Sequence, residues 1–177
     1  MMALHPMGAS MITCRPIERT DLPMLKRWRN STDVMPYVRE YRFLTDHDQE
    51  RWYSSYLASR RTSDFDQELL ILEWEGEAFG VGGFTRIEWK NRKAELSFYS
   101  INRDYIKEAL TALIDKAFNE FGFHKIYWPV YSHDPNLETY SDIFHEEAVL
   151  CDEYYYNGWQ DRIYLSLLNP NDDSNDE

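Results

Sequence analysis

Short runs of apolar residues, with the length and the aromatic or β-branched content typical of strands, recur along the chain between polar turns. They predict strands over residues 12–17, 67–74, 78–89, 93–100, 125–131, 149–156 and 159–167. The alternation of apolar and polar side chains is clearest from Ala94 to Tyr99, which is typical of a half-buried strand. Turn residues at 75–77 and at Asn157-Gly158 predict two hairpins, one from the second and third strands and one from the last two.

Apolar residues spaced three and four apart predict helices between these strands. The helices span residues 22–30, 33–37, 45–60, 103–121 and 137–144. Thr45 and Asp48 have the spacing of a capping box at the start of the third helix, which we expect to bury Trp52 and Tyr56. Gly122 follows the long fourth helix, where a glycine can adopt the left-handed conformation that ends a helix.

The joint between the strand over 93–100 and the next helix, at residues 100–107, has the position of an anion-binding site. Backbone N–H groups at a helix N-terminus can hold a phosphate, and glycines usually let the backbone approach it closely. No glycine lies between Gly83 and Gly122. The joint therefore has the architecture of a phosphate site without the residues that usually complete one.

This order of elements predicts one mixed α/β domain over residues 12–168, with the strands in one sheet and helices on both of its faces. Residues 1–11 show no periodicity, and we expect a flexible extension there. Residues 169–177 form a polar, acidic tail that we expect to be disordered. The total of 177 residues fits a single domain with a sizeable core.

Composition narrows the possible functions. The hydrophobic content of 43% excludes a mostly disordered chain, and no apolar run is long enough to span a membrane. A net charge of −12 argues against a nucleic-acid binder, which normally presents a basic face. The charge is compatible with a cationic amine substrate or a basic partner, and equally with a simple solubility balance. Because the start of the chain has no convincing secretory signal, we expect a cytoplasmic protein.

Cysteine and histidine form no catalytic or metal-binding pattern. Cys14 and Cys151 lie in predicted strands among apolar residues, so we expect buried, reduced thiols. The five histidines lack metal-ligand spacing and Cys-x-x-Cys is absent, so we expect no metal site. Ser97 and Ser100 lack the context of a nucleophilic serine.

A series of short motifs follows along the chain. They are Arg15-Pro16-Ile17, Leu25–Asn30, Arg39–Arg42, Gln49–Trp52, Gly80–Phe84, Trp89–Glu95, Glu108-Ala109-Leu110, Phe121–Ile126 and Tyr154–Gly158. In order and spacing these motifs resemble the GNAT superfamily of acyl-CoA-dependent N-acyltransferases, in the branch of ribosomal-protein and sugar-nucleotide N-acetyltransferases. Two features depart from the family: the glycine loop that binds the CoA pyrophosphate is missing, and Ile143-Phe144-His145 replaces a Leu-Gly-Phe.

The resemblance implies a mixed, mostly antiparallel central sheet, acetyl-CoA as co-substrate, and acetyl transfer to a primary amine. The amine would belong to a small molecule, a sugar nucleotide or a peptide N-terminus, and the chain could form a homodimer or bind a protein partner. The missing glycines, together with Asp134 where relatives carry an Asn, leave an alternative open. The chain would then be an inactive pseudo-acetyltransferase that serves as a protein-binding or assembly module.

Two residues are candidate catalytic groups on this resemblance. Glu95 lies in mid-strand, where family members use a carboxylate to take the proton of the amine. Tyr140 matches a tyrosine that protonates the CoA thiolate. The alternative for Glu95 is a strand carboxylate paired with a base such as Arg86. The alternative for Tyr140 is a helix tyrosine packed against the sheet.

The candidate cofactor-binding residues lie around the glycine-free joint. The resemblance implies that one strand segment pairs with the pantetheine amides, namely Leu96, Ser97, Phe98 and Tyr99. Arg103 and Lys107 could hold the pyrophosphate by charge, or they could be exposed cations of the first helical turns. Asp134 stands where relatives contact the cofactor, with a plain helix cap as the alternative.

The region between the first two strands shapes the acceptor pocket in relatives. Its candidate substrate-binding residues are Arg39, Tyr41, Arg42 and Trp52. Arg39 and Arg42 could bind a carboxylate or a phosphate of the acceptor. Surface ion pairs with Glu40 or Asp46 are the alternative.

Overall fold

The structure is a computed structural model that describes residues 12–39 and 41–172. Its strands are β1 (Ile12–Pro16), β2 (Glu68–Trp74), β3 (Glu77–Glu88), β4 (Lys93–Ser100), β5 (Lys125–Tyr131), β6 (His145–Tyr155) and β7 (Trp159–Leu168). Its α-helices are α1 (Leu22–Arg29), α2 (Asp46–Ser59), α3 (Ile106–Asp115) and α4 (Leu137–Ser141). Short 3-10 turns are η1 (Arg19–Asp21), η2 (Met35–Tyr37), η3 (Trp89–Asn91) and η4 (Arg103–Tyr105), and a π-helical turn is η5 (Lys116–Glu120). The predicted extension over 1–11, Glu40 and the end of the acidic tail lie outside the described residues.

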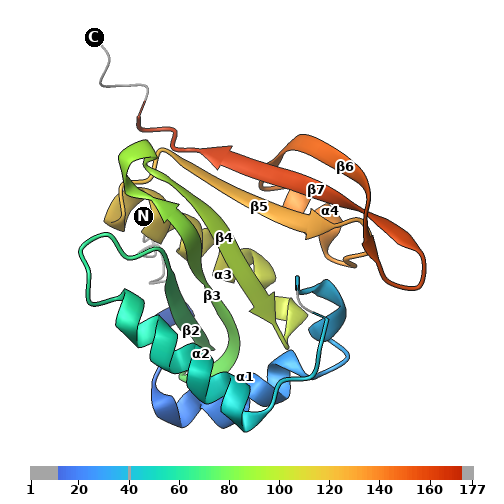
Figure 1. The fold of residues 1–177 in the computed structure, drawn as a ribbon. Coiled ribbons are helices and arrows are strands. Elements are labelled where there is room, and N and C mark those ends of the chain that lie inside the picture. Colours follow the sequence, from blue (N-terminus) through green and yellow to red (C-terminus); the bar gives the residue numbers. More distant parts are fainter. Residues whose placement is uncertain (1–11, 40, 173–177) are drawn as a thin grey trace, which may run out of the picture.

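The strands form one sheet in the order β1-β2-β3-β4-β5-β7-β6 (Figure 1). Every neighbouring pair is antiparallel except β4 and β5, which are parallel and are joined through α3. A parallel pair needs such a crossover, because a tight turn can only reverse the chain. The predicted mixed, mostly antiparallel sheet is confirmed.

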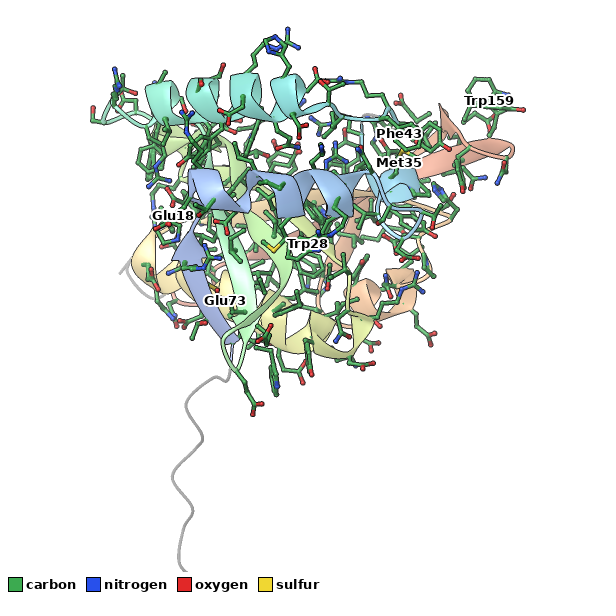
Figure 2. All side chains as sticks on the ribbon, turned by 90° about the horizontal axis from the view of Figure 1, so that it is seen from below. Glu18, Trp28, Met35, Phe43, Glu73 and Trp159 are labelled. Carbon is green, nitrogen blue, oxygen red and sulfur yellow. The ribbon has the colours of Figure 1, made fainter. Side chains whose placement is uncertain are left out.

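Helices cover both faces of this sheet, as predicted. On one face α1 and α2 lie side by side and pack Leu25, Trp28 and Tyr56 against Ile71 and other residues of the first strands (Figure 2). The other face packs against α3, η5 and α4, whose buried residues join those of the strands in the larger core cluster. A strand such as β2 serves both layers because successive side chains point to opposite faces.

The two halves of the sheet separate between β4 and β5. These strands pair at only three positions, from Lys93↔Lys125 to Glu95↔Tyr127. Beyond them the strands diverge, and Figure 1 shows β5, β7 and β6 leaving β4 at a wide angle. Among the described residues, the edge of β4 that faces β5 has no strand partner after Glu95.

Two glycines adopt positive φ angles, one at a helix end and one where two strands approach closely. Gly122 has φ +64° directly after the last helical turn, which confirms the predicted left-handed helix end. Gly83 of β3 has φ +150°, and a Cβ there would lie 2.0 Å from the carbonyl oxygen of Glu68. Only glycine fits the second position without moving the neighbouring strand.

The structure corrects several sequence predictions. The helix predicted over 137–144 ends at Ser141, and β6 begins at His145 rather than at residue 149. Trp52 is half-buried, whereas Tyr56 is buried as expected. Among the described residues, no helix is long and apolar enough to cross a lipid bilayer.

The expected burial of both thiols is wrong. The thiol of Cys151 is exposed because β6 is the last strand of the sheet and most of its side chains face solvent, while Cys14 is only half-buried. Residues 169–172, the described part of the acidic tail, contact the rest of the chain. Asn169 is buried and donates to the carbonyl of Phe123, and Asp172 pairs with Arg92 at 2.7 Å.

Candidate functional site

A cavity of about 520 Å³ opens where β4 and β5 diverge. Its wall combines β4 from Glu95 to Tyr99, β5 around Trp128, the end of α1, the start of α2 and the loop between these helices. A cavity of this volume can enclose a metabolite-sized ligand. The divergence of the two strands therefore produces a site, because it leaves a gap in the sheet that the helices on that face only partly cover.

Glu95 lies in this wall with its side chain almost fully buried. Arg39 donates to Oε1 at 2.7 Å and Arg86 donates to Oε2 at 3.2 Å. A buried carboxylate requires such partners, because desolvation without them is strongly unfavourable. The sequence-based alternative, a pair with Arg86, is present, and it coexists with a position in the cavity wall.

The backbone places Arg86 in the cavity by a local irregularity of β3. The register with β4 shifts between Thr85 and Glu88, and Arg86 has φ +49°. In a regular strand two successive side chains face opposite sides of the sheet, yet Thr85 and Arg86 both line the cavity. A non-glycine residue in this region is strained by about 1–2 kcal/mol, which the ion pair with Glu95 helps to offset.

A second, smaller cavity of about 50 Å³ lies beside the first, toward the N-terminus of α3. Tyr140, Asp134 and Arg103 line it. The two cavities share six wall residues, namely Tyr37, Val38, Phe98, Tyr99, Trp128 and Pro129. They are therefore parts of one cleft that these side chains divide.

Tyr140 is buried against Trp128, with 4.4 Å between the ring centroids. Its hydroxyl group donates to Oδ2 of Asp134 at 3.5 Å, while Oδ1 of Asp134 accepts from the backbone and side-chain nitrogens of Asn136. Burial, and secondarily the charge of Asp134, raise the pKa of Tyr140 well above its usual value. Burial also raises the pKa of Asp134. The phenol therefore remains a proton donor throughout the neutral pH range.

The joint at residues 100–107 is closed by its own polar groups. The amide of Asn102 donates to Oγ of Ser100, and the amide of Asp104 donates to Oδ1 of Asn102, both at 3.0 Å. These two N–H groups are thus already engaged instead of pointing at a ligand. Of the two candidate cations, Arg103 lines the smaller cavity, whereas Lys107 lines neither cavity and pairs with Asp142 at 3.3 Å.

The candidate acceptor residues come from the loop between α1 and α2 and, in the case of Trp52, from α2 itself. Arg39, Arg42 and Trp52 line the larger cavity, whereas Tyr41 does not and packs against Tyr156. Of the ion-pair partners expected from the sequence, Glu40 lies outside the described residues, and Asp46 pairs with Lys26. Arg39 pairs with Glu95, and Arg42 with Asp48 at 3.5 Å.

Hydrogen bonds from both ends hold this loop over the cleft. Asn30 binds both backbone groups of Leu44 with its side-chain amide, at 2.9 and 2.7 Å. His133 donates from Nε2 to the carbonyl oxygen of Pro36 at 3.0 Å, and its ring lies against Tyr37 and Tyr156. The loop is thereby tied to β5 and the β6–β7 hairpin, which lie far away in sequence.

Sequence reasoning missed two arginines of the larger cavity. Arg29 ends α1, and Arg162 lies on β7 with its guanidinium 5.6 Å from the ring centre of Tyr131. Arg29 lies within the motif Leu25–Asn30 but nothing in the motif marks it as a cavity residue, and Arg162 lies outside every motif. Only the packing of α1 and β7 around the cleft identifies them. Among the described residues, no group of three or more His, Cys, Asp or Glu side chains is placed to hold a metal ion.

Comparison with known proteins points to one family. A family model described as the acetyltransferase (GNAT) domain matches residues 12–138. The spermidine N(1)-acetyltransferase of Vibrio cholerae serotype O1 is 23% identical over 165 residues, which cover 88% of this chain and 93% of that protein.

Solved structures of a spermidine N-acetyltransferase from Vibrio cholerae share the fold. A crystal structure of its complex with CoA and spermine superposes with a TM-score of 0.81 at 23% identity, covering 91% of this chain and 97% of that one. A dodecameric structure in an intermediate state gives a TM-score of 0.75 at 21% identity, covering 91% and 95%.

Proposed function

Because the chain belongs to the acetyltransferase (GNAT) domain family, we propose that it transfers the acetyl group of acetyl-CoA to a primary amine of a small molecule. Such a reaction requires a place for the thioester beside a place for the amine, and a group that stabilises the leaving thiolate. The family model covers all the residues that line the cleft except Tyr140 and Arg162, which lie beyond its last matched residue, 138.

The observation that carries the proposal is the separation of β4 from β5 next to a cavity. The free edge of β4 over Leu96–Tyr99 offers backbone N–H and C=O groups to an extended ligand, as an edge strand does to a peptide. The pantetheine arm of CoA contains two amides and can pair in this way. The thioester would then lie between Glu95 and Tyr140, where the two cavities meet.

In this arrangement Tyr140 protonates the departing thiolate, and Glu95 takes the proton of the amine. Tyr140 suits its role because burial keeps its phenol protonated. An ionised carboxylate has about four acceptor positions, and the arginines occupy two on Glu95. Glu95 can therefore still accept a hydrogen bond from the amine or from a water bound to it.

The pyrophosphate of CoA would be bound mainly by charge. The engaged amides of Asn102 and Asp104 cannot form the usual backbone cradle without rearranging. Arg103 is the cation in the wall of the smaller cavity and would supply charge-assisted hydrogen bonds instead. We therefore expect weaker binding of CoA than in relatives with a glycine loop.

Calorimetric titration with acetyl-CoA tests this function. We expect saturable binding and a higher melting temperature, since ligand at 100 times its dissociation constant adds about 2.7 kcal/mol to the free energy of unfolding. Arg103→Gln should weaken binding about tenfold, whereas Lys107→Gln, which removes a cation outside both cavities, should change it little. Absence of binding at millimolar acetyl-CoA would refute the transferase and leave the assembly module as the better explanation.

We also infer that the chain assembles with copies of itself through β6. This outermost strand of 11 residues exposes Val149 and Leu150, and an unpaired edge of that length is normally covered or blocked. The dodecameric structure of the Vibrio cholerae enzyme is in keeping with a homo-oligomer.

A further inference from the structure

We propose that the amine accepted by the larger cavity also carries an anionic group, a carboxylate or a phosphate. This inference rests on the proposed function, because it assigns the acceptor of that same site. The charge of such an anionic group is opposite to that of spermine, the polyamine named for the similar Vibrio cholerae enzyme.

The charge of the cavity is opposite to that of the chain. Five arginines line it, namely Arg29, Arg39, Arg42, Arg86 and Arg162. Among the described residues, two carboxylates, Asp48 and Glu95, also line it, so this part of the wall has an excess of three positive charges. The whole chain has a net charge of −12. A ligand in the cavity is governed by the nearby arginines, because salt screens more distant charges beyond about 8 Å.

Both carboxylates already have arginine partners that balance their charge. Asp48 accepts from the backbone and hydroxyl groups of Thr45 in the capping box of α2, and Arg51 donates to its other oxygen at 2.8 Å. Glu95 receives one arginine on each oxygen. A polyamine would therefore meet an excess of guanidinium groups and no carboxylate without an arginine partner, which disfavours its binding.

The arginines reach the cavity from separate parts of the fold. Arg29 comes from the end of α1, Arg42 from the loop before α2, and Arg162 from β7. Arg86 requires a strained backbone to enter it. Such strain at a cavity wall is typical of functional positions, since a surface ion pair alone would not require it.

An anionic group suits such a wall. Guanidinium groups bind carboxylates and phosphates through paired, charge-assisted hydrogen bonds. Glu95 holds Arg39 and Arg86 in place, so a ligand would find these donors already oriented. With about 520 Å³, the cavity can admit the amine end of an amino-sugar phosphate or a small peptide.

Matched pairs of acceptors test the inference. The probes are glucosamine 6-phosphate against glucosamine, glycylglycine against glycinamide, and spermidine. Binding is measured by calorimetry with and without CoA, and acetyl transfer by release of the CoA thiol. We expect the affinity and the kcat/KM of at least one anionic compound to exceed those of its neutral counterpart about tenfold or more. Spermidine should bind more weakly than that anionic compound. The two pairs separate a phosphate from a carboxylate.

A matched pair of variants links the preference to the cavity. Arg42 and Arg51 both contact Asp48, but only Arg42 lines the cavity. Arg42→Gln should reduce the ratio of kcat/KM for the charged acceptor to kcat/KM for the neutral acceptor about tenfold. Arg51→Gln should preserve this ratio. Both variants change the net charge equally, which removes long-range electrostatics as an explanation.

The outcomes separate this inference from the proposed function. Tighter binding of spermidine than of both anionic compounds, or equal behaviour within both pairs, overturns the anionic acceptor. If acetyl-CoA does not bind but an anionic compound binds in a manner that depends on Arg42, the cavity assignment stands and the transferase fails. Equal effects of Arg42→Gln and Arg51→Gln would also contradict the inference.

Discussion

At the scale of single residues, burial decides what a side chain can do in this cleft. Tyr140 is 3% exposed, its hydroxyl group donates to Asp134, and both residues line the smaller cavity. Removing the phenol from water disfavours its ionised form, so it can donate a proton but is a poor base.

Tyr140→Phe should therefore lower kcat about 100-fold and change the KM for acetyl-CoA little, because it removes a proton donor and leaves the ring. Steady-state kinetics measure both constants. Tyr53→Phe is the control, since Tyr53 is also buried and lines neither cavity. The raised pKa further predicts that kcat does not fall between pH 7 and 9 through ionisation of Tyr140. Equal kcat in Tyr140→Phe and the unmodified chain would exclude it as the acid.

The buried carboxylate of Asp21 stabilises the fold. Asp21 accepts two hydrogen bonds from the guanidinium of Arg15, at 2.8 and 2.9 Å, and one from the amide of Glu18. The hydrogen bonds from Arg15 lower the pKa of Asp21 below its usual value. The ionised form is thus favoured in the folded chain, and its contribution to stability is complete above the unfolded pKa of about 3.9.

Asp21→Asn should lower the free energy of unfolding at pH 7 by about 1–2 kcal/mol. We expect no larger effect because Arg15 is partly exposed, and solvent weakens its ion pair with Asp21. As the pH falls below about 4, the native chain should lose this contribution, and the difference between the two proteins should narrow. Urea unfolding at several pH values measures it. Asp46→Asn, which alters an exposed pair with Lys26, should have little effect. A difference that grows on acidification would contradict the assignment.

At the scale of elements, β3 shapes the cleft through departures from regular strand geometry. Its glycines let neighbouring parts approach closely, and its bulge turns Arg86 into the cavity. Gly82 lies so close to Leu113 that a Cβ would be 2.4 Å from its side chain, and Gly83 meets the backbone of β2. Side chains can move away from an added atom, whereas a paired strand cannot.

Gly83→Ala should therefore destabilise the chain by about 3 kcal/mol, from backbone strain and from the clash with Glu68. Gly76→Ala is the control, because φ is also positive there but a Cβ would meet nothing within 4 Å. We expect about 1 kcal/mol at Gly76. Thermal and urea unfolding of both variants measure the difference. Similar losses at both positions would show that φ alone, and not the approach of β2, requires glycine at position 83.

At the scale of the whole molecule, the outermost strand is the natural surface for assembly. β6 has charged residues on both sides of a short apolar segment that contains Val149 and Leu150, and its side chains are nearly all exposed. Trp159, at the tip of the same hairpin, projects from the edge of the molecule (Figure 2).

Leu150→Lys should weaken self-association about 100-fold, because a lysine would have to lose its hydration at the interface. Light scattering after size exclusion, over a range of concentrations, measures the change. Leu57→Lys is a matched control, since Leu57 of α2 has the same 40% exposure as Leu150. An unchanged mass in Leu150→Lys, or an equal change in both variants, would place the interface elsewhere.

The order of helices and strands was predictable because it depends on nearby residues. The alternation over Ala94–Tyr99, the capping box at Thr45 and the Asn157-Gly158 turn all act within a few positions and appear as predicted. Predictions failed where contacts between residues distant in sequence determine the environment of a side chain. Cys151 is in an apolar run but lies on the edge of the sheet, and no local pattern distinguishes an edge strand from a central one.

The sequence alone determined the mixed sheet and its helices, because hydrophobic periodicity and turn chemistry are local properties. Only the tertiary structure decided the charge of the cavity. Arg29, Arg86 and Arg162 are separated by long stretches of chain and share one wall because α1, β3 and β7 meet where β4 and β5 diverge. Electrostatics depends on distance in space, and an acidic chain can in this way enclose a basic cavity.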